Sequence, residues 1–189
     1  GAFIAACFIS NNPHDFHLAP RIWELFTLYE TKAYNDSEMA LKLGFNTVVP
    51  VSALDICVPS DIRRLTCGDG FTKAKFIDKC KFYNPEIRNV FIAAIADFTI
   101  QELQQLLSFI TGTQTLPFDP NFEIRISFLS FNNTDVNEKN WPLPVAHTCF
   151  KSVDIAQFTN PAILADKLRL AMYTIMISDG RPNSENLSL

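Results

Sequence analysis

The sequence predicts an α+β protein in which helices surround a small β-sheet. Over most of the 189 residues, apolar side chains recur three or four positions apart, which is the spacing of one helix face. From Asn121 the spacing changes to two, which is typical of a strand that is buried on one side. The alternating apolar residues are Phe122, Ile124, Ile126 and Phe128. Helices that stand before and after one such sheet are typical of the α+β class.

The first third of the chain is predicted to form short helices. Residues 2–9 are apolar on every side, so a helix there needs neighbours all round. A second helix is expected after Pro20, where apolar residues again have helical spacing. A third is expected over residues 36–43, with Gly44 as a left-handed residue just beyond its end. A fourth is expected over residues 62–66.

Longer helices are expected in the rest of the chain. The first of them spans residues 71–83. Asn84-Pro85 supplies a cap and a first-turn proline for the next, and Thr99 with Glu102 forms a capping box at the start of another. The last helix begins at Asn160-Pro161. The apolar stripes of the last three helices predict core positions: Ile87, Phe91, Ala94, Ile95, Phe98, Ile100, Leu103, Leu107, Ile110, Leu164, Leu168, Ala171, Met172 and Ile175.

Charge and hydropathy argue against two kinds of partner. The 16 basic and 20 acidic residues give a net charge of -4, and no dense run of Lys or Arg marks a nucleic-acid surface. The longest apolar stretch, residues 2–9, is far shorter than the roughly 20 residues that a membrane helix needs. The sequence therefore predicts a soluble chain without nucleic-acid or membrane partners.

The cysteines and histidines predict neither a disulfide scaffold nor a metal site. Five cysteines are an odd number and include no C-x-x-C pair, which favours a reducing compartment. His14 and His17 are three residues apart, but Pro13 indicates a turn and no further ligand lies nearby in sequence. We therefore expect no metal and no cofactor, and a cytoplasmic or nuclear location.

The chemistry of the sequence centres on Cys149. Leu143-Pro144 favours an extended backbone, since the residue before a proline avoids the α region, so Cys149 is expected at the end of a short strand. This strand is predicted to pair with the one that contains Ile124. A thiol is the least handicapped side-chain nucleophile at neutral pH, because a few per cent is already thiolate. The alternative is that Cys149 is a small buried apolar residue.

The residues around Cys149 resemble the catalytic-cysteine motif of the HECT family of ubiquitin ligases. The matching residues run Leu143-Pro144-x-x-His147-Thr148-Cys149-Phe150. Further landmarks follow in the order and spacing of the family's C-terminal lobe: residues 106–113, Leu116-Pro117, and Leu164-x-x-Lys167-Leu168. The resemblance therefore implies a HECT C-lobe, with helices around a small sheet, over residues 71 to about 177.

The resemblance also implies how the chain is divided. Residues 1–67 are similar to pieces of the family's N-lobe, residues 68–70 lie where the family has its interlobe hinge, and residues 71–189 form the C-lobe. In the family, a subdomain that docks the ubiquitin-conjugating enzyme interrupts the N-lobe. Only about fifteen residues, 27–41, stand at that place here, which is too few for a subdomain with its own core. We therefore expect the first part to be an incomplete N-lobe that exposes apolar side chains.

For the family, the implied reaction is ubiquitin transfer through Cys149. The cysteine takes ubiquitin from a conjugating enzyme as a thioester and passes it to a lysine of a protein substrate. His147, Thr148 and Leu143 are expected to support catalysis or to position the ubiquitin tail. In an extended segment, His147 and Cys149 share one face about 6 to 7 Å apart at Cα, so His147 is either a general base or a residue that orients the loop. The alternative function is a non-catalytic ubiquitin-binding or scaffold lobe, because the docking subdomain is missing.

Overall fold

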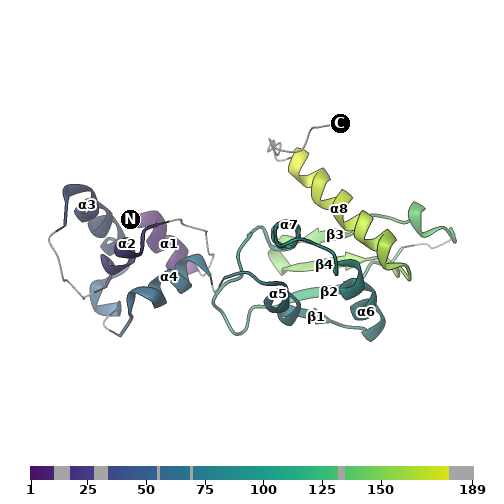
Figure 1. Ribbon diagram of the computed structural model, residues 1–189, viewed down its shortest axis with the longest axis horizontal. Helices are drawn as coiled ribbons and strands as arrows, with labels where there is room; N and C mark the ends of the chain where they lie inside the picture. The colour runs from purple at the N-terminus through teal and green to yellow at the C-terminus, as the bar shows by residue number, and fades with distance from the viewer. Residues whose placement is uncertain (11–17, 28–33, 55, 69, 132–134, 179–189) are drawn as a thin grey trace. The chain divides into compact units, whose positions relative to one another are not determined.

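The computed structural model describes residues 1–10, 18–27, 34–54, 56–68, 70–131 and 135–178 (Figure 1). The chain divides into two compact units. The first unit is Gly1–Phe71 with Thr113–Phe122, and the second is Thr72–Gly112 with Glu123–Leu189. The division between Phe71 and Thr72 lies next to the predicted hinge, but the segment Thr113–Phe122, expected in the C-lobe, groups with the first unit. The assignment of the units to an N-lobe remnant and a C-lobe stays a prediction.

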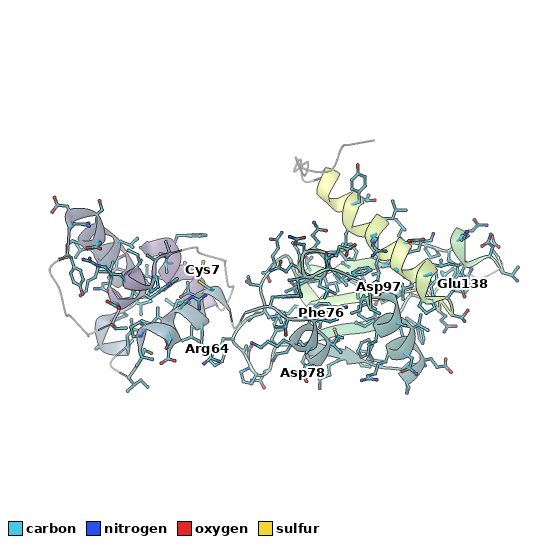
Figure 2. All side chains as sticks on the ribbon, viewed as in Figure 1. Cys7, Arg64, Phe76, Asp78, Asp97 and Glu138 are labelled. Atoms are coloured by element: carbon cyan, nitrogen blue, oxygen red, sulfur yellow. The ribbon has the colours of Figure 1, made fainter. Side chains whose placement is uncertain are left out.

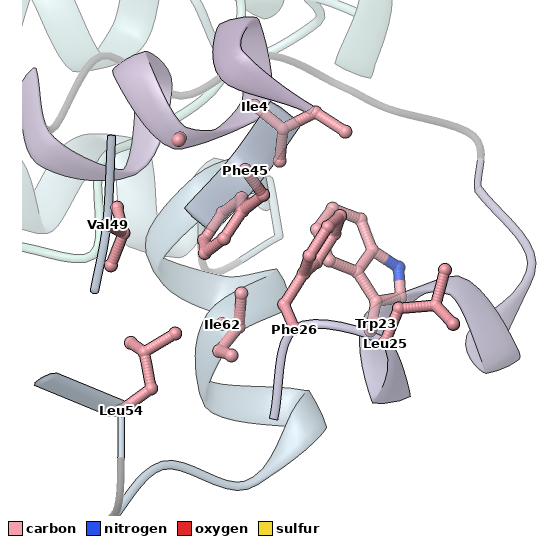
Figure 3. Packing of buried hydrophobic residues seen from close by; sticks show 9 residues of the cluster. Ile4, Trp23, Leu25, Phe26, Phe45, Val49, Leu54 and Ile62 are labelled. Carbon is pink, nitrogen blue, oxygen red and sulfur yellow. The ribbon is translucent and has the colours of Figure 1, made fainter. Parts of the chain in front are cut away.

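The first unit is built from short helices around an aromatic core. Its elements are α1 (Ala2–Ser10), α2 (Pro20–Glu24), α3 (Asp36–Asn46), the 3-10 turn η1 (Val51–Leu54) and α4 (Pro59–Cys67). The rings of Phe26 and Phe45 stack with centroids 4.2 Å apart, and Trp23 meets Phe26 edge to face (Figure 3). The buried cluster consists of Ile4, Ala5, Trp23, Leu25, Phe26, Phe45, Val49, Leu54 and Ile62.

The predicted end of α3 at Gly44 is wrong, because the helix continues to Asn46. Gly44 lacks the positive φ of a helix-ending glycine, which Gly112 at the end of α7 does have. Gly44 lies inside α3 against the start of α1, where a Cβ atom would lie 3.4 Å from the backbone nitrogen of Ala2 and from Cα of Gly1, an ordinary van der Waals distance.

The surface of α1 agrees with the expected shortage of neighbours. Ile4, Ala5 and Cys7 are buried, but Phe3 and Ile9 each expose 61% of their surface. An all-round apolar helix with one covered side leaves large apolar side chains in water.

The second unit contains a four-stranded mixed sheet, which confirms the predicted α+β class. The strands are β1 (Cys80–Phe82), β2 (Ile124–Phe128), β3 (Val145–His147) and β4 (Ser152–Ile155), in the spatial order β1-β2-β4-β3. β1 and β4 each pair in parallel with β2, and β3 pairs antiparallel with β4.

Two predictions about these strands are wrong. Residues 80–82, expected as the end of a helix over 71–83, form β1, and the helix is only Lys73–Lys79 (α5). β3 does not pair with β2, because β4 lies between them. Three- and four-residue strands are too short to reveal their period in the sequence.

Three long helices of the second unit cap and pack as predicted. They are α6 (Pro85–Ala94), capped by Asn84, α7 (Ile100–Thr111), with the Thr99 and Glu102 capping box, and α8 (Pro161–Ser178). α6 packs against β1 and β2, α7 against β3 and β4, and α8 against α6 and α7. Most of the predicted core residues are buried: Ile87, Phe91, Ala94, Ile95, Phe98, Leu103, Leu107, Ile110, Leu164, Leu168, Ala171 and Met172. The prediction for Ile100 is wrong, because this first residue of α7 is 46% exposed. The side chain of Ile175 lies outside the described part of the chain.

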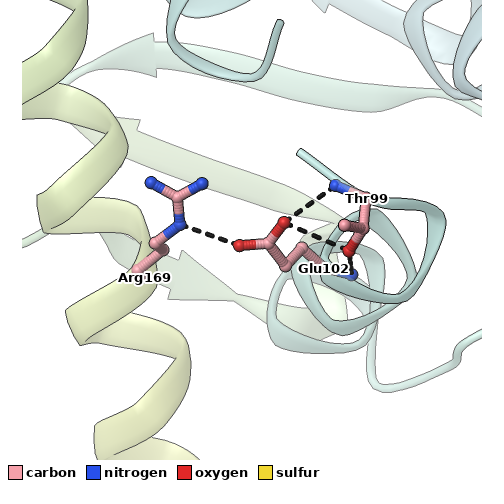
Figure 4. A network of polar contacts seen from close by, with 3 residues as sticks. All are labelled: Thr99, Glu102 and Arg169. Carbon is pink, nitrogen blue, oxygen red and sulfur yellow. Dashed lines mark hydrogen bonds and ion pairs between the residues drawn. The ribbon is translucent and has the colours of Figure 1, made fainter. Parts of the chain in front are cut away.

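Two carboxylates tie α8 to the rest of the second unit. Glu102 binds the backbone nitrogen and hydroxyl of Thr99 and also accepts a 2.8 Å hydrogen bond from Nε of Arg169 on α8 (Figure 4). Glu138, which Figure 2 labels, lies in the 3-10 turn η2 (Glu138–Asn140). It accepts hydrogen bonds from Thr159 and Asn160, just before α8. Within the described part of the chain, no helix has the length and apolar character needed to cross a membrane.

Candidate functional site

The predicted site lies on a β-hairpin of the second unit. β3 ends at His147, the 3-10 turn η3 spans Thr148–Phe150, and β4 starts at Ser152. The register pairs Val145 with Asp154 and His147 with Ser152. The chain reverses at Lys151, whose backbone is left-handed (φ 51°, ψ 46°) and whose nitrogen donates to the carbonyl of Thr148 at 3.1 Å. A non-glycine residue in this conformation carries a steric cost, so the turn is held by its surroundings.

Cys149 is the middle residue of η3, and its side chain is exposed. The other four cysteines, Cys7, Cys57, Cys67 and Cys80, are buried or partly buried. The alternative that Cys149 is a buried apolar residue is therefore wrong. The short extended lead-in is present, because β3 ends two residues before the cysteine.

Arg125 of β2 fixes the backbone on the far side of the cysteine. Its backbone nitrogen donates to the carbonyl of Lys151 at 2.9 Å, and its guanidinium donates to the carbonyl of Phe150 at 3.3 Å. Together with β4, which pairs with β2, these bonds hold the turn that carries Cys149 on a sheet strand rather than on a loose loop.

His147 and Asp154 form a polar pair across the hairpin. The Nε2 atom of His147 lies 3.1 Å from Oδ2 of Asp154, with side-chain exposures of 44% and 28%. The second carboxylate oxygen of Asp154 accepts a 2.5 Å hydrogen bond from Oγ of Ser127, its direct register partner on β2. Three neighbouring strands thus contribute one side chain each to a continuous polar chain that ends beside η3.

The site differs from the predicted geometry in one respect. The extended backbone stops at His147, and Thr148–Phe150 turn as a 3-10 helix. The prediction that His147 and Cys149 share one face of an extended segment is therefore wrong. His147, Thr148 and Cys149 still lie on consecutive positions of one hairpin. Leu143 lies two residues before β3 and is partly buried, behind the buried Pro144.

Sequence reasoning missed Asp154, Ser127 and Arg125. A signal for Asp154 was available, because it lies between Val153 and Ile155, which are both fully buried. An apolar-polar-apolar triplet indicates a strand with one polar side chain on its open face. The contacts of Ser127 and Arg125 depend on the pairing of β2 with β4, which the sequence does not specify.

No metal site is formed by the described residues, among which no three His, Cys, Asp or Glu side chains gather in a suitable cluster. His14 and His17, the pair weighed as metal ligands, lie outside the described residues.

Comparison with known proteins gives a consistent result. The family model described as "HECT-domain (ubiquitin-transferase)" matches residues 24–175. Human "Probable E3 ubiquitin-protein ligase HERC3" is 24% identical over 140 residues, which are 70% of this chain and 13% of that protein. Mouse "Probable E3 ubiquitin-protein ligase HECTD2" is 28% identical over 138 residues, 68% of this chain and 17% of that protein.

A third relative, rat "E3 ubiquitin-protein ligase NEDD4", is 26% identical over 151 residues, 75% of this chain and 17% of that protein. The chain therefore spans less than a fifth of the length of each of these three relatives.

Proposed function

Because the chain belongs to the HECT-domain ubiquitin-transferase family, we propose that it is a ubiquitin-protein ligase lobe in which Cys149 carries ubiquitin as a thioester. Its partners would be ubiquitin, a ubiquitin-conjugating enzyme and a protein substrate. The observation that carries the proposal is the exposed thiol of Cys149 on a braced hairpin within the matched residues. A thiol that exchanges acyl groups with another protein must lie at the surface, and the exposed position of Cys149 supports this role.

The first step would be a thioester exchange. The Cys149 thiolate attacks the carbonyl carbon that joins the ubiquitin C-terminus to a cysteine of the conjugating enzyme. A new carbon-sulfur bond forms, the old one breaks, and the enzyme's thiolate leaves. Because one thioester replaces another, the step is close to balance, and holding the two sulfurs in position supplies most of the catalysis.

The second step would be transfer to a lysine. The amine attacks the thioester carbonyl, an amide forms, and Cys149 leaves as a thiolate. The amine must lose a proton during this step, so a nearby base helps. His147 borders the turn that carries Cys149, Thr148 shapes that turn through its carbonyl, and Leu143 lies on the approach where the ubiquitin tail would run.

A reducing compartment, cytoplasmic or nuclear, suits this chemistry. An exposed thiol that must stay reduced to work is compatible with the odd number of cysteines and with such a location.

The second candidate function is a ubiquitin-binding or scaffold lobe without activity. It is favoured by the large apolar side chains that the first unit exposes, Phe3 and Ile9 among them, since these are surfaces that a missing subdomain would cover. In this case the hairpin would bind ubiquitin without forming a covalent bond.

Charging with ubiquitin separates the two functions. The full chain is incubated with ubiquitin, ubiquitin-activating enzyme, a conjugating enzyme and ATP, and the products are separated with and without reducing agent. Ligase function predicts a reductant-sensitive adduct that Cys149→Ala abolishes and that Cys57→Ala, a control at a half-buried cysteine, retains. Ubiquitin binding without an adduct would support the scaffold.

A further inference from the structure

We propose that Asp154 and Ser127 position the His147 imidazole so that its Nδ1 atom takes the proton of the attacking lysine amine. This inference rests on the proposed function, because it concerns the second step of that reaction. His147 belongs to the cysteine motif, whereas Asp154 and Ser127 lie outside it, and the three side chains come together only when β2, β3 and β4 pair.

The contact with Asp154 determines the tautomer of His147. A carboxylate has lone pairs but no proton, so it can only accept hydrogen bonds. Nε2 of His147 lies 3.1 Å from Oδ2 of Asp154, so Nε2 carries the hydrogen. In the neutral ring the lone pair is then on Nδ1, which is free to accept a proton. The carboxylate would also stabilise the imidazolium that forms when the proton arrives.

Two hydrogen bonds fix the orientation of Asp154. Oδ1 accepts the hydroxyl hydrogen of Ser127 at 2.5 Å while Oδ2 accepts from His147, so both carboxylate oxygens are used and the group cannot turn. The backbone of Asp154 is also held in place. Its neighbours Val153 and Ile155 are fully buried, and Asp154 itself pairs with Ser127 on β2 and with Val145 on β3. A base that is held by packed strands keeps its orientation through the reaction.

The charged side chains near the His147 and Asp154 pair have other hydrogen-bond partners. The guanidinium of Arg125 is directed at the carbonyl of Phe150. α7 packs against β3 and η3, and its one titratable side chain, Glu102, is bonded to Thr99 and Arg169. Lys151 follows η3 on the same hairpin. In the part of the chain that the structure describes, His147 is thus the one ionisable side chain within ion-pair distance of Asp154.

The chemical step balances as follows. The lysine ammonium first loses one proton to water, and the neutral amine then forms a bond to the thioester carbonyl carbon. A second proton passes from the same nitrogen to Nδ1 of His147. The carbon-sulfur bond breaks, and Cys149 leaves as a thiolate. The imidazolium then releases its proton to water, so the products are an amide, a thiolate and two protons.

The test uses two nucleophiles of different basicity on the same charged protein. The full chain is first charged with ubiquitin, and its discharge is then timed with free lysine or with hydroxylamine. Lysine's side-chain amine has a pKa of about 10.4 and arrives protonated at pH 7.5, so it needs a base, whereas hydroxylamine is already neutral. A merely structural defect slows both reactions, but loss of a positioned base slows the lysine reaction alone.

The expected results are specific. H147Q and D154N should charge normally and react normally with hydroxylamine, but discharge to lysine about ten- to a hundredfold more slowly. S127A should slow the lysine reaction about three- to tenfold, since one hydrogen bond to the carboxylate is lost, and S127T should restore it. D97N, which removes an exposed charge after α6, is the matched control and should behave as the native chain.

Each other outcome has a clear meaning. If D154N and S127A discharge to lysine at the native rate, or if they slow lysine and hydroxylamine equally, the inference is overturned while the proposed function stands. If the native chain never accepts ubiquitin, the proposed function fails and this inference fails with it.

Discussion

Removing the carboxylate of Glu138 should loosen the start of α8. Glu138 accepts hydrogen bonds from the backbone nitrogen and hydroxyl of Thr159, at 2.8 and 2.5 Å, and from the backbone nitrogen of Asn160 at 3.1 Å. Asn160 is in turn bonded to the nitrogen of Ala162 in the first turn of α8. The carboxylate thus joins η2 to the N-terminus of α8, which is the positive end of the helix dipole.

The magnitude follows from what each substitution removes. A helix cap is worth about 0.5–2 kcal/mol and a charge beside a helix N-terminus about 0.3–1 kcal/mol. Because the site faces solvent, values near the lower ends apply. Glu138→Ala loses all three bonds and the charge, so we expect about 1 kcal/mol of lost stability. Glu138→Gln keeps one acceptor oxygen, so we expect about half of that loss.

The pH dependence has a definite sign. Partial burial alone would raise the pKa of Glu138, but the hydrogen bonds from Thr159 and Asn160 outweigh it and hold the pKa below its ordinary value of 4.5. A carboxyl whose pKa is lower in the folded state stabilises the protein above the unfolded value and loses this effect as pH falls through the folded value. The difference between the native chain and Glu138→Ala should therefore be full at pH 7 and shrink below pH 4.5.

The assay is urea unfolding followed by tryptophan fluorescence. All variants carry Trp23→Phe, so that the remaining tryptophan, Trp141, reports on the second unit, where it is 8% exposed and its indole nitrogen donates to the carbonyl of Asp135. The midpoint should fall with an unchanged slope. Equal losses for Glu138→Ala at pH 7 and pH 3 would refute the reasoning, because the carboxylate charge would then contribute nothing.

Three further predictions concern reactivity and packing. Iodoacetamide at pH 8 should label exposed Cys149 first and leave Cys80 unmodified, because burial raises the pKa of the Cys80 thiol to about 12 and also blocks access to it. Mass spectrometry of the peptides measures the labelling of each cysteine, and equal labelling of the two would contradict this prediction. Phe91→Ala should lower the free energy of unfolding by about 3–5 kcal/mol, since Phe91 is fully buried and its ring meets that of Phe82 edge to face, with centroids 5.7 Å apart. A loss below about 1 kcal/mol in thermal unfolding would contradict the observed packing. Gly112→Ala should cost about 1 kcal/mol, because Gly112 ends α7 at φ 80° with open space around it, and an unchanged melting temperature would contradict this.

Local signals made the helices of the second unit predictable. The Asn84-Pro85 start of α6 and the Thr99 and Glu102 box of α7 act within three residues of each other, and the structure has both. β2 was also predictable, because five residues in alternation reveal one buried face.

The parts that depend on long-range pairing were not predictable. β1 and β4 are three and four residues long and become strands only because β2 lies between them. The contact between Ser127 and Asp154 follows from that register, 27 residues apart in sequence. The sequence around Gly44 predicts a helix end, but Gly44 lies inside α3 against the start of α1, and this long-range contact cannot be predicted from neighbouring residues.

The same limit applies to the candidate site. The motif predicted Cys149 and its short extended lead-in, because Leu143-Pro144 acts locally, but it placed the cysteine at the end of the strand rather than on the 3-10 turn that follows it. The polar chain that reaches His147 needs three strands in register, so it became visible only in the folded structure.

The central claim is that Cys149 can accept ubiquitin. The most direct measurement is intact mass spectrometry of the full chain after incubation with ubiquitin whose C-terminus carries a small alkyl thioester, because this donor needs no conjugating enzyme and no docking subdomain. We predict one added ubiquitin, which is removed by dithiothreitol, located on the Cys149 peptide and absent from Cys149→Ala. Ubiquitin that attaches equally well to Cys149→Ala, or to no cysteine of the native chain, would contradict the claim.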